Sequence, residues 1–339
     1  MPTITILGGG VAGLTLAATL DPTAYDVTLI ERNPGHSRVP TAYGIWPFAL
    51  QALERIKLAE EVRGSGLQLT SAVITADSAR RPVTMTKADA TVWLITRPAL
   101  LRLLDASVPD TVVRQQRHVA DATTLAGDLV VAADGARSVV RTRVWQDEPR
   151  DTGVVAIRGV TETPPDIPLD QMREFWGDGM LFGVGPNPLP HGTGTNWYAS
   201  ARRGEDTPAG ALAWARGAYA GFPPLVRATL AAADPGRTVV NTILESRRAR
   251  ELVRDRYVLV GDAAHAMSPN LGRGACEAMV DAITLGEALN EHGPGGARHY
   301  EDARLRKGQR TRAAAAMARR LALSARAGRA VVQVAARLG

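Results

Sequence analysis

A lone carboxylate followed by a glycine-rich loop and a helix start is the stretch of the chain best suited to hold a ligand. An apolar strand is predicted over 257–260, Asp262 follows it, and the next loop contains Pro269, Gly272 and Gly274. Asp262 can accept hydrogen bonds from ligand hydroxyls, and the glycines let a flat ligand approach the backbone closely. A helix that begins after Gly274 would offer free N–H groups and a partial positive charge. These features predict a ligand-binding corner.

A second glycine-rich segment has the spacing of a dinucleotide-binding turn. Gly8, Gly10 and Gly13 form G-x-G-x-x-G between a predicted strand, 3–7, and an apolar helix that begins at Leu14. The first glycine permits the tight turn, the second lets the backbone approach a pyrophosphate, and the third lets the helix pack on the strand. The alternative is a glycine-rich turn in an unrelated α/β protein.

Glu31 supports the dinucleotide interpretation. It ends the next predicted strand, 18 residues after Gly13, close to the roughly 20 residues expected for a ribose-binding acid. An acid at this position favours ribose hydroxyls over a 2′-phosphate. It does not by itself distinguish FAD from NAD.

The order of the motifs resembles the FAD fingerprints of class A FAD-dependent monooxygenases, the para-hydroxybenzoate hydroxylase-like aromatic-ring hydroxylases. The matching runs are G-D-A-A-H at 261–265, Pro269, G-R-G-A-C at 272–276 and D-A at 281–282. The segment D-G-A-R-S-V-V-R at 134–141 looks like the family's D-G-x-x-S-x-x-R motif, associated there with flavin and pyridine nucleotide. The predicted cofactor-binding residues are Gly8, Gly10, Val11, Ala12, Gly13, Glu31, Arg32, Arg97, Asp134, Asp262, Pro269, Gly272, Arg273, Gly274 and Ala275.

Several of these residues keep two interpretations. Ser138 and Arg141 either stabilise the helix that follows them or hold a phosphate. Arg97 matches the family's flavin-contacting arginine, but it also suits a surface ion pair. Arg273 stands where the family often has glutamine, and it binds either an acidic group or only solvent. Phe48 replaces a common asparagine in a segment, 42–50, that normally lies close to the isoalloxazine ring.

The resemblance implies an α/β fold with three parts. A Rossmann-like FAD-binding domain would comprise 1–66, 92–152 and 243–296. An interleaved antiparallel β-sheet domain that walls the substrate pocket would comprise 67–91 and 153–242, and a C-terminal helical region 297–339. The stretch 151–240 reads as alternating β segments with turns.

The aromatic residues of the middle segment are the predicted substrate contacts. Phe175 and Trp176 are adjacent, as are Trp197 and Tyr198, so on strands one member of each pair should face the flavin and the other the outside. The alternative is that these aromatics form only the core of the sheet. The predicted substrate-contacting residues are Tyr43, Trp176, Phe182, Val184, Trp197 and Tyr198.

Composition bounds the compartment and the partners. No run of about 18 apolar residues is present, so no membrane span is indicated, and the start of the chain lacks a signal-peptide pattern. Cys276 is the only cysteine, which excludes intrachain disulfides and favours the cytoplasm. The net charge is +6, and the basic tail suits a helix packed on the flavin domain better than one on an anionic membrane. Its arginines are not interleaved with stacking aromatics, so nucleic-acid binding is not expected.

The resemblance also implies the chemistry. NADH or NADPH would bind transiently and reduce FAD, which would react with O₂ to give a flavin C4a-hydroperoxide. One oxygen atom would then enter a small hydrophobic molecule, aromatic or polycyclic, by hydroxylation or epoxidation; the sequence identifies no catalytic residue and no metal site. The alternatives are a reductase or halogenase of the same fold, or a flavoprotein that binds a ligand without turnover. The protein is expected to be a monomer or a homodimer.

Overall fold

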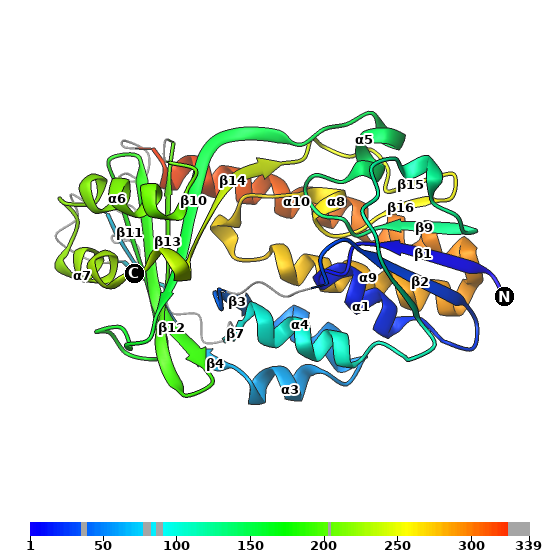
Figure 1. The fold of residues 1–339 in the computed structure, drawn as a ribbon, viewed down its shortest axis with the longest axis horizontal. Coiled ribbons are helices and arrows are strands. Elements are labelled where there is room, and N and C mark those ends of the chain that lie inside the picture. Colours follow the sequence, from blue (N-terminus) through cyan, green and yellow to red (C-terminus); the bar gives the residue numbers. More distant parts are fainter. Residues whose placement is uncertain (35–38, 77–82, 86–90, 203–204, 325–339) are drawn as a thin grey trace.

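Two large sheets, each covered by helices, make up most of the molecule (Figure 1). The computed structural model describes residues 1–34, 39–76, 83–85, 91–202 and 205–324. The six-stranded sheet lies at the right of Figure 1 and the seven-stranded sheet at the left. The α/β fold with a Rossmann-like part and a second sheet is therefore confirmed.

The six-stranded sheet is mostly parallel, as expected for a nucleotide-binding domain. Only its edge pair, β15 and β16, is antiparallel. Its strand order is β15 (Val253–Arg254), β16 (Tyr257–Leu259), β9 (Leu129–Ala132), β1 (Thr3–Leu7), β2 (Asp26–Glu31) and β8 (Val113–Gln116).

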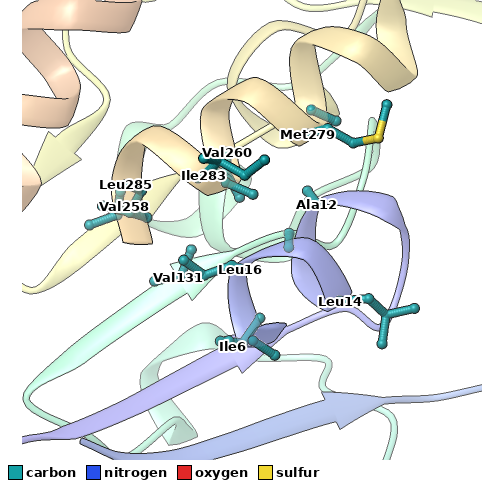
Figure 2. Packing of buried hydrophobic residues seen from close by; sticks show 14 of the residues in the cluster. Ile6, Ala12, Leu14, Leu16, Val131, Val258, Val260, Met279, Ile283 and Leu285 are labelled. Carbon is teal, nitrogen blue, oxygen red and sulfur yellow. The ribbon is translucent and has the colours of Figure 1, made fainter. Parts of the chain in front are cut away.

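Helices α1 (Val11–Thr19) and α9 (Gly274–His292) pack on each other and on this sheet. Figure 2 shows Leu16 of α1 and Ile283 of α9 in the same apolar core as Val131 of β9. Gly286 of α9 permits this close approach, because a Cβ atom there would lie 2.6 Å from the Thr19 side chain. The two predicted ligand-binding segments therefore belong to one rigid core.

The seven-stranded sheet is antiparallel except where β11 and β5 pair in parallel. Its strand order is β14 (Thr238–Glu245), β10 (Arg150–Thr161), β13 (Gly192–Ala201), β12 (Met180–Leu189), β11 (Gln171–Gly177), β5 (Ser71–Ala76) and β6 (Val83–Met85).

Two helices cover one face of this sheet, α6 (Pro208–Ala218) and α7 (Pro224–Ala232). The expectation of only β segments and turns across 151–240 was wrong here. Thr207 caps α6 by accepting a hydrogen bond from the Gly210 backbone, and a proline starts each helix. We call the covered face the outer face and the opposite one the inner face.

The remaining described elements surround a three-stranded sheet of β3 (Ala42–Ile45), β7 (Val92–Thr96) and β4 (Leu67–Leu69). The other helices are α2 (Pro47–Glu54), α3 (Ala59–Gly64), α4 (Arg97–Ala106), α5 (Val139–Trp145) and α8 (Asp262–His265). Short 3-10 turns are η1 (Ala122–Thr124), η2 (Pro235–Arg237), η3 (Pro269–Leu271) and η4 (Gly293–Gly295).

The last described helix, α10 (Gly296–Ala322), packs on α9, and its end reaches the inner face through Ala322 and Leu323. Two of its arginines are buried: Arg304 pairs with Glu277 and Asp281, and Arg319 pairs with Glu245. Part of the positive charge of the tail is thus internal. The rest of the predicted helical region, 325–339, lies outside the described residues.

We propose the domain division given by the sequence, because β5 joins the same sheet as β10 to β14. Strands β10 and β14 extend across the boundaries at 152/153 and 242/243, so both strands connect the two domains. Among the described residues, no helix combines the length and apolar character needed to cross a lipid bilayer.

Candidate FAD and substrate site

The turn between β1 and α1 is built around its glycines. Gly8 has a φ of +107°, and a Cβ atom there would lie 2.4 Å from the Ala133 carbonyl oxygen. A Cβ atom on Gly13 would lie 1.9 Å from the Gly8 carbonyl oxygen, so only glycine fits. Gly10, in contrast, has no atom within 4 Å of a Cβ position. Two glycines therefore close the turn, and the third leaves space beside the start of α1.

The first turn of α1 receives no side-chain cap, so its N–H groups are free to bind an anion. Val11 and Ala12 lie in this turn. The free N–H groups and the open space at Gly10 would accommodate a pyrophosphate.

Glu31 both shapes the turn and faces it. Its Oε2 accepts a hydrogen bond from the Gly9 backbone at 2.7 Å, and its Oε1 accepts one from the Asn33 backbone at 2.8 Å. Each carboxylate oxygen keeps capacity for a second donor such as a ribose hydroxyl. Arg32, the next residue, is exposed.

Asp262 begins α8, two residues after Val260, which follows the core strand β16. The Asp262 carboxylate reaches solvent, but the protein around it removes part of its hydration and so raises its pKa. The charges of His265 and Arg97 oppose this rise. A Cβ atom on Gly274 would lie 3.9 Å from Asp262 Oδ1, so the carboxylate stands beside the start of α9. No side chain caps α9. A carboxylate next to an uncapped helix start can hold hydroxyl groups while the helix binds negative charge.

A buried ionic network fixes this corner from behind. Asp281 Oδ2 accepts a hydrogen bond from the Gly261 backbone at 3.0 Å and lies 2.6 Å from His265 Nε2. Arg304 donates from Nε to Asp281 Oδ1 at 2.6 Å and also binds Glu277. Burial would raise the pKa of Asp281, but His265 and Arg304 outweigh it and lower that pKa. The Asp281 carboxylate is therefore ionised, and it holds Gly261, the residue before Asp262, in its φ of +58°.

The loop from Pro269 to Ala275 is held by contacts to α2. The Trp46 indole N–H donates to the Gly272 carbonyl oxygen at 3.2 Å. The Arg273 guanidinium lies 4.4 Å from the centre of the Phe48 ring and 3.4 Å from Glu277. Arg273 thus has protein partners, which differs from the solvated loop residue considered for it. Pro269 and Gly272 are exposed, and Ala275 lies in the first turn of α9.

The 134–141 motif acts mainly within the protein. Asp134 Oδ2 accepts a hydrogen bond from the Val139 backbone at 2.8 Å, and Ser138 caps α5. Arg141 is buried and donates to the Ala263 and Ala264 carbonyl oxygens and to Asp147. Of the two roles considered for Ser138 and Arg141, these contacts favour stabilisation of α5 and α8.

Tyr43 and Arg97 lie at the edge of the three-stranded sheet next to the inner face. The Arg97 guanidinium lies 5.8 Å from the centre of the Tyr43 ring. Ala42, the neighbour of Tyr43, donates its backbone N–H to Asn196 of β13 at 3.0 Å. Burial raises the pKa of the Tyr43 hydroxyl, although Arg97 and Arg158 lower it. The charge of Asp262 also raises the pKa of Tyr43. The loop that carries Asp262 and the inner face therefore meet at Tyr43.

The inner face carries a polar group that sequence reasoning missed. Glu174 of β11 accepts hydrogen bonds from the Trp176 indole at 2.9 Å and from the Tyr198 hydroxyl. Arg158 of β10 is the strand partner of Tyr198. Burial, and next the charge of Glu174, raise the pKa of Tyr198 well above its usual value. All four side chains keep partial solvent access.

The prediction that Phe182, Val184 and Trp197 contact the substrate was wrong. Each is fully buried on the outer face, in the core formed with α6 and α7. Phe182 stacks on Trp197 with ring centres 5.9 Å apart. Side chains alternate along a strand, so only Trp176 and Tyr198 of the predicted sheet residues point toward the flavin domain.

Comparison with known proteins identifies the family of the chain. Residues 103–319 match the family model described as FAD binding domain. The chain is 31% identical to the aurachin C monooxygenase/isomerase of Stigmatella aurantiaca, over 85% of this chain and 80% of that protein. It is 29% identical to the 3-amino-4-hydroxybenzoate 2-monooxygenase of Streptomyces cremeus, over 94% of this chain and 86% of that protein.

A solved structure, Klebsiella pneumoniae HpxO complexed with FAD and uric acid, superposes with a TM-score of 0.85 at 22% identity. The superposition covers 99% of this chain and 93% of that one. The chain belongs to the FAD-binding-domain family of class A flavin monooxygenases. It is an FAD-dependent monooxygenase.

Proposed function

We propose that the enzyme takes electrons from NADH or NADPH and inserts one oxygen atom of O₂ into an aromatic substrate held against the inner face. The observation that carries the proposal is a set of solvent-accessible side chains: Tyr43 and Arg158, whose charges interact with Asp262, and Tyr198 and Trp176 on the same inner face. FAD, when bound, would supply the electron transfer and oxygen activation; the protein positions the reactants and excludes water.

The residues for FAD are proposed from the geometry of the two corners. The start of α1, with Gly10, would hold the pyrophosphate, and Glu31 the adenosine ribose. Asp262 would accept hydrogen bonds from the hydroxyls of the ribityl chain, and Arg97 would contact the cofactor from the start of α4. The uncapped start of α9 at Gly274 would stabilise negative charge on the flavin.

The substrate would lie between this cofactor and the inner face. Tyr198 covers Gly183, whose missing side chain leaves room for the phenol ring: a Cβ atom there would lie 2.1 Å from the ring. Glu174 fixes Tyr198 and Trp176 together. Such a held aromatic wall can orient a flat substrate and keep the site dry.

Alanine at Trp176 or Tyr198 should leave FAD bound but admit water to the site. NAD(P)H consumption should then exceed product formation, and the difference should appear as hydrogen peroxide. Alanine at Trp197 or Phe182 should instead destabilise the fold by about 3–5 kcal/mol, because a buried aromatic is lost. Oxygen-electrode, peroxide and melting measurements on the four variants separate the two groups. Full coupling in both inner-face variants would place the substrate elsewhere.

A further inference from the structure

Arg158 is a partly buried cationic side chain that has no ion-pair or hydrogen-bond partner among the described residues. No carboxylate of the described chain lies within the 4.0 Å of an ion pair with it, and it makes no side-chain hydrogen bond there. It keeps partial solvent access, although burial lowers the pKa of its guanidinium. The nearest acid on the inner face, Glu174, is occupied by Tyr198 and Trp176.

A second guanidinium makes this arrangement less favourable still. Arg97 has no ion-pair partner among the described residues, only the Tyr43 ring at 5.8 Å, and its charge opposes that of Arg158. Removing a cation from water without a counter-charge is costly, and a like charge nearby adds to the cost. Asp262 compensates only in part, because it too lies beyond ion-pair distance. Arg97 is exposed and can be screened by water, so it is Arg158 that calls for an anion supplied by a ligand.

We propose that Arg158 binds an acidic group of the substrate, a carboxylate or an ionised ring hydroxyl, and thereby selects aromatic acids. The inference rests on the proposed function, since Arg158 would form one end of the substrate site proposed there. A guanidinium presents paired N–H donors that match a carboxylate, and the hydrogen bonds are charge-assisted. Arg97, at the flavin corner, is left for the cofactor.

The inner face accommodates such a molecule with its acid at one end. Arg158, Tyr198 and Glu174 stand on β10, β13 and β11, so they span three strand spacings across the sheet, about 14 Å. The acidic group would lie beside Arg158, and the ring would lie along Tyr198. Trp176 would close the far end.

Matched pairs of an aromatic acid and its amide test the proposal on the FAD-loaded enzyme. Salicylate, 4-hydroxybenzoate and anthranilate would each be compared with its amide by titration, following the flavin absorbance. At least one acid should bind the parent roughly 10- to 150-fold more tightly than its amide, the range expected for charge-assisted hydrogen bonds. Arg158→Gln should remove that preference and leave amide binding and FAD content unchanged, while Arg158→Lys should keep part of it.

Arg202→Gln serves as the control, since Arg202 is an exposed arginine just after β13. It should retain the parent's preference. Equal preference in Arg158→Gln and the parent, or no binding of any acid by the parent, overturns the proposal. Loss of FAD from Arg158→Gln overturns it too, because Arg158 would then serve the cofactor. Failure of the proposed function would appear separately, as a parent that does not oxidise NAD(P)H with any aromatic substrate.

Discussion

Replacing Asp262 with alanine is expected to weaken FAD binding by roughly 10- to 150-fold, since a hydrogen bond to a charged group contributes about 1.5–3 kcal/mol. The carboxylate is solvent-accessible and stands beside the start of α9. Its removal takes away acceptors for the proposed ribityl hydroxyls and leaves the core strand intact. Titration of apoprotein with FAD, followed by flavin fluorescence, gives the dissociation constant.

Asp134→Ala is the matched control for this experiment. Asp134 also follows a core strand, but its Oδ2 is already used by the Val139 backbone. Its loss should lower the free energy of unfolding by about 1 kcal/mol, as for a lost helix cap, and should change FAD affinity less than Asp262→Ala does. Equal FAD affinity in the Asp262 variant and the parent would remove that residue from the site.

Gly13→Ala is expected to have the largest effect on the fold of the cofactor site. The added Cβ atom would lie 1.9 Å from the Gly8 carbonyl oxygen and 3.3 Å from Ile6. Strand and helix must separate to admit it, which should cost roughly 3 kcal/mol and abolish FAD retention. Thermal melting of the apoprotein and the flavin content after purification measure the two effects.

Gly10→Ala separates cofactor contact from folding in the same turn. A methyl group there meets no atom within 4 Å, and the backbone φ of −87° suits alanine. The apoprotein should therefore stay within about 1 kcal/mol of the parent, while FAD affinity should fall because the methyl group occupies the space proposed for the pyrophosphate. An unchanged FAD affinity would show that the pyrophosphate lies away from Gly10.

The sequence predicted the first strand–turn–helix unit, β1 to α1, because the constraints on this unit are local. Gly8, Gly13 and Glu31 are required by contacts within one strand–turn–helix unit, so their spacing along the chain indicates their geometry. The helices α6 and α7 were missed although the sequence carries a signal for them: Pro208 and Pro224 stand at their starts. In α6 and at its C-cap the buried residues Leu212, Ala215 and Tyr219 recur at helical spacing.

The substrate side was less predictable for a physical reason. Adjacent residues on a strand point to opposite faces, and the sequence does not say which face meets the flavin. Trp197 and Tyr198 were therefore both candidates, and only the packing of α6 on Trp197 separates them. Arg158 left one usable signal: it is a charged residue at alternating spacing with the apolar Val154 and Ala156 of the same strand.

Anaerobic mixing of the purified, FAD-loaded enzyme with NADH or NADPH tests whether the protein is an NAD(P)H-dependent monooxygenase. The flavin absorbance near its visible maximum should bleach with at least one of the two nucleotides, and faster when a bound aromatic substrate is present. Admission of O₂ should then restore the oxidised spectrum, with oxygenated product formed in the presence of substrate. A flavin that stays oxidised with both nucleotides, with and without aromatic ligands, would contradict the assignment as an NAD(P)H-dependent monooxygenase.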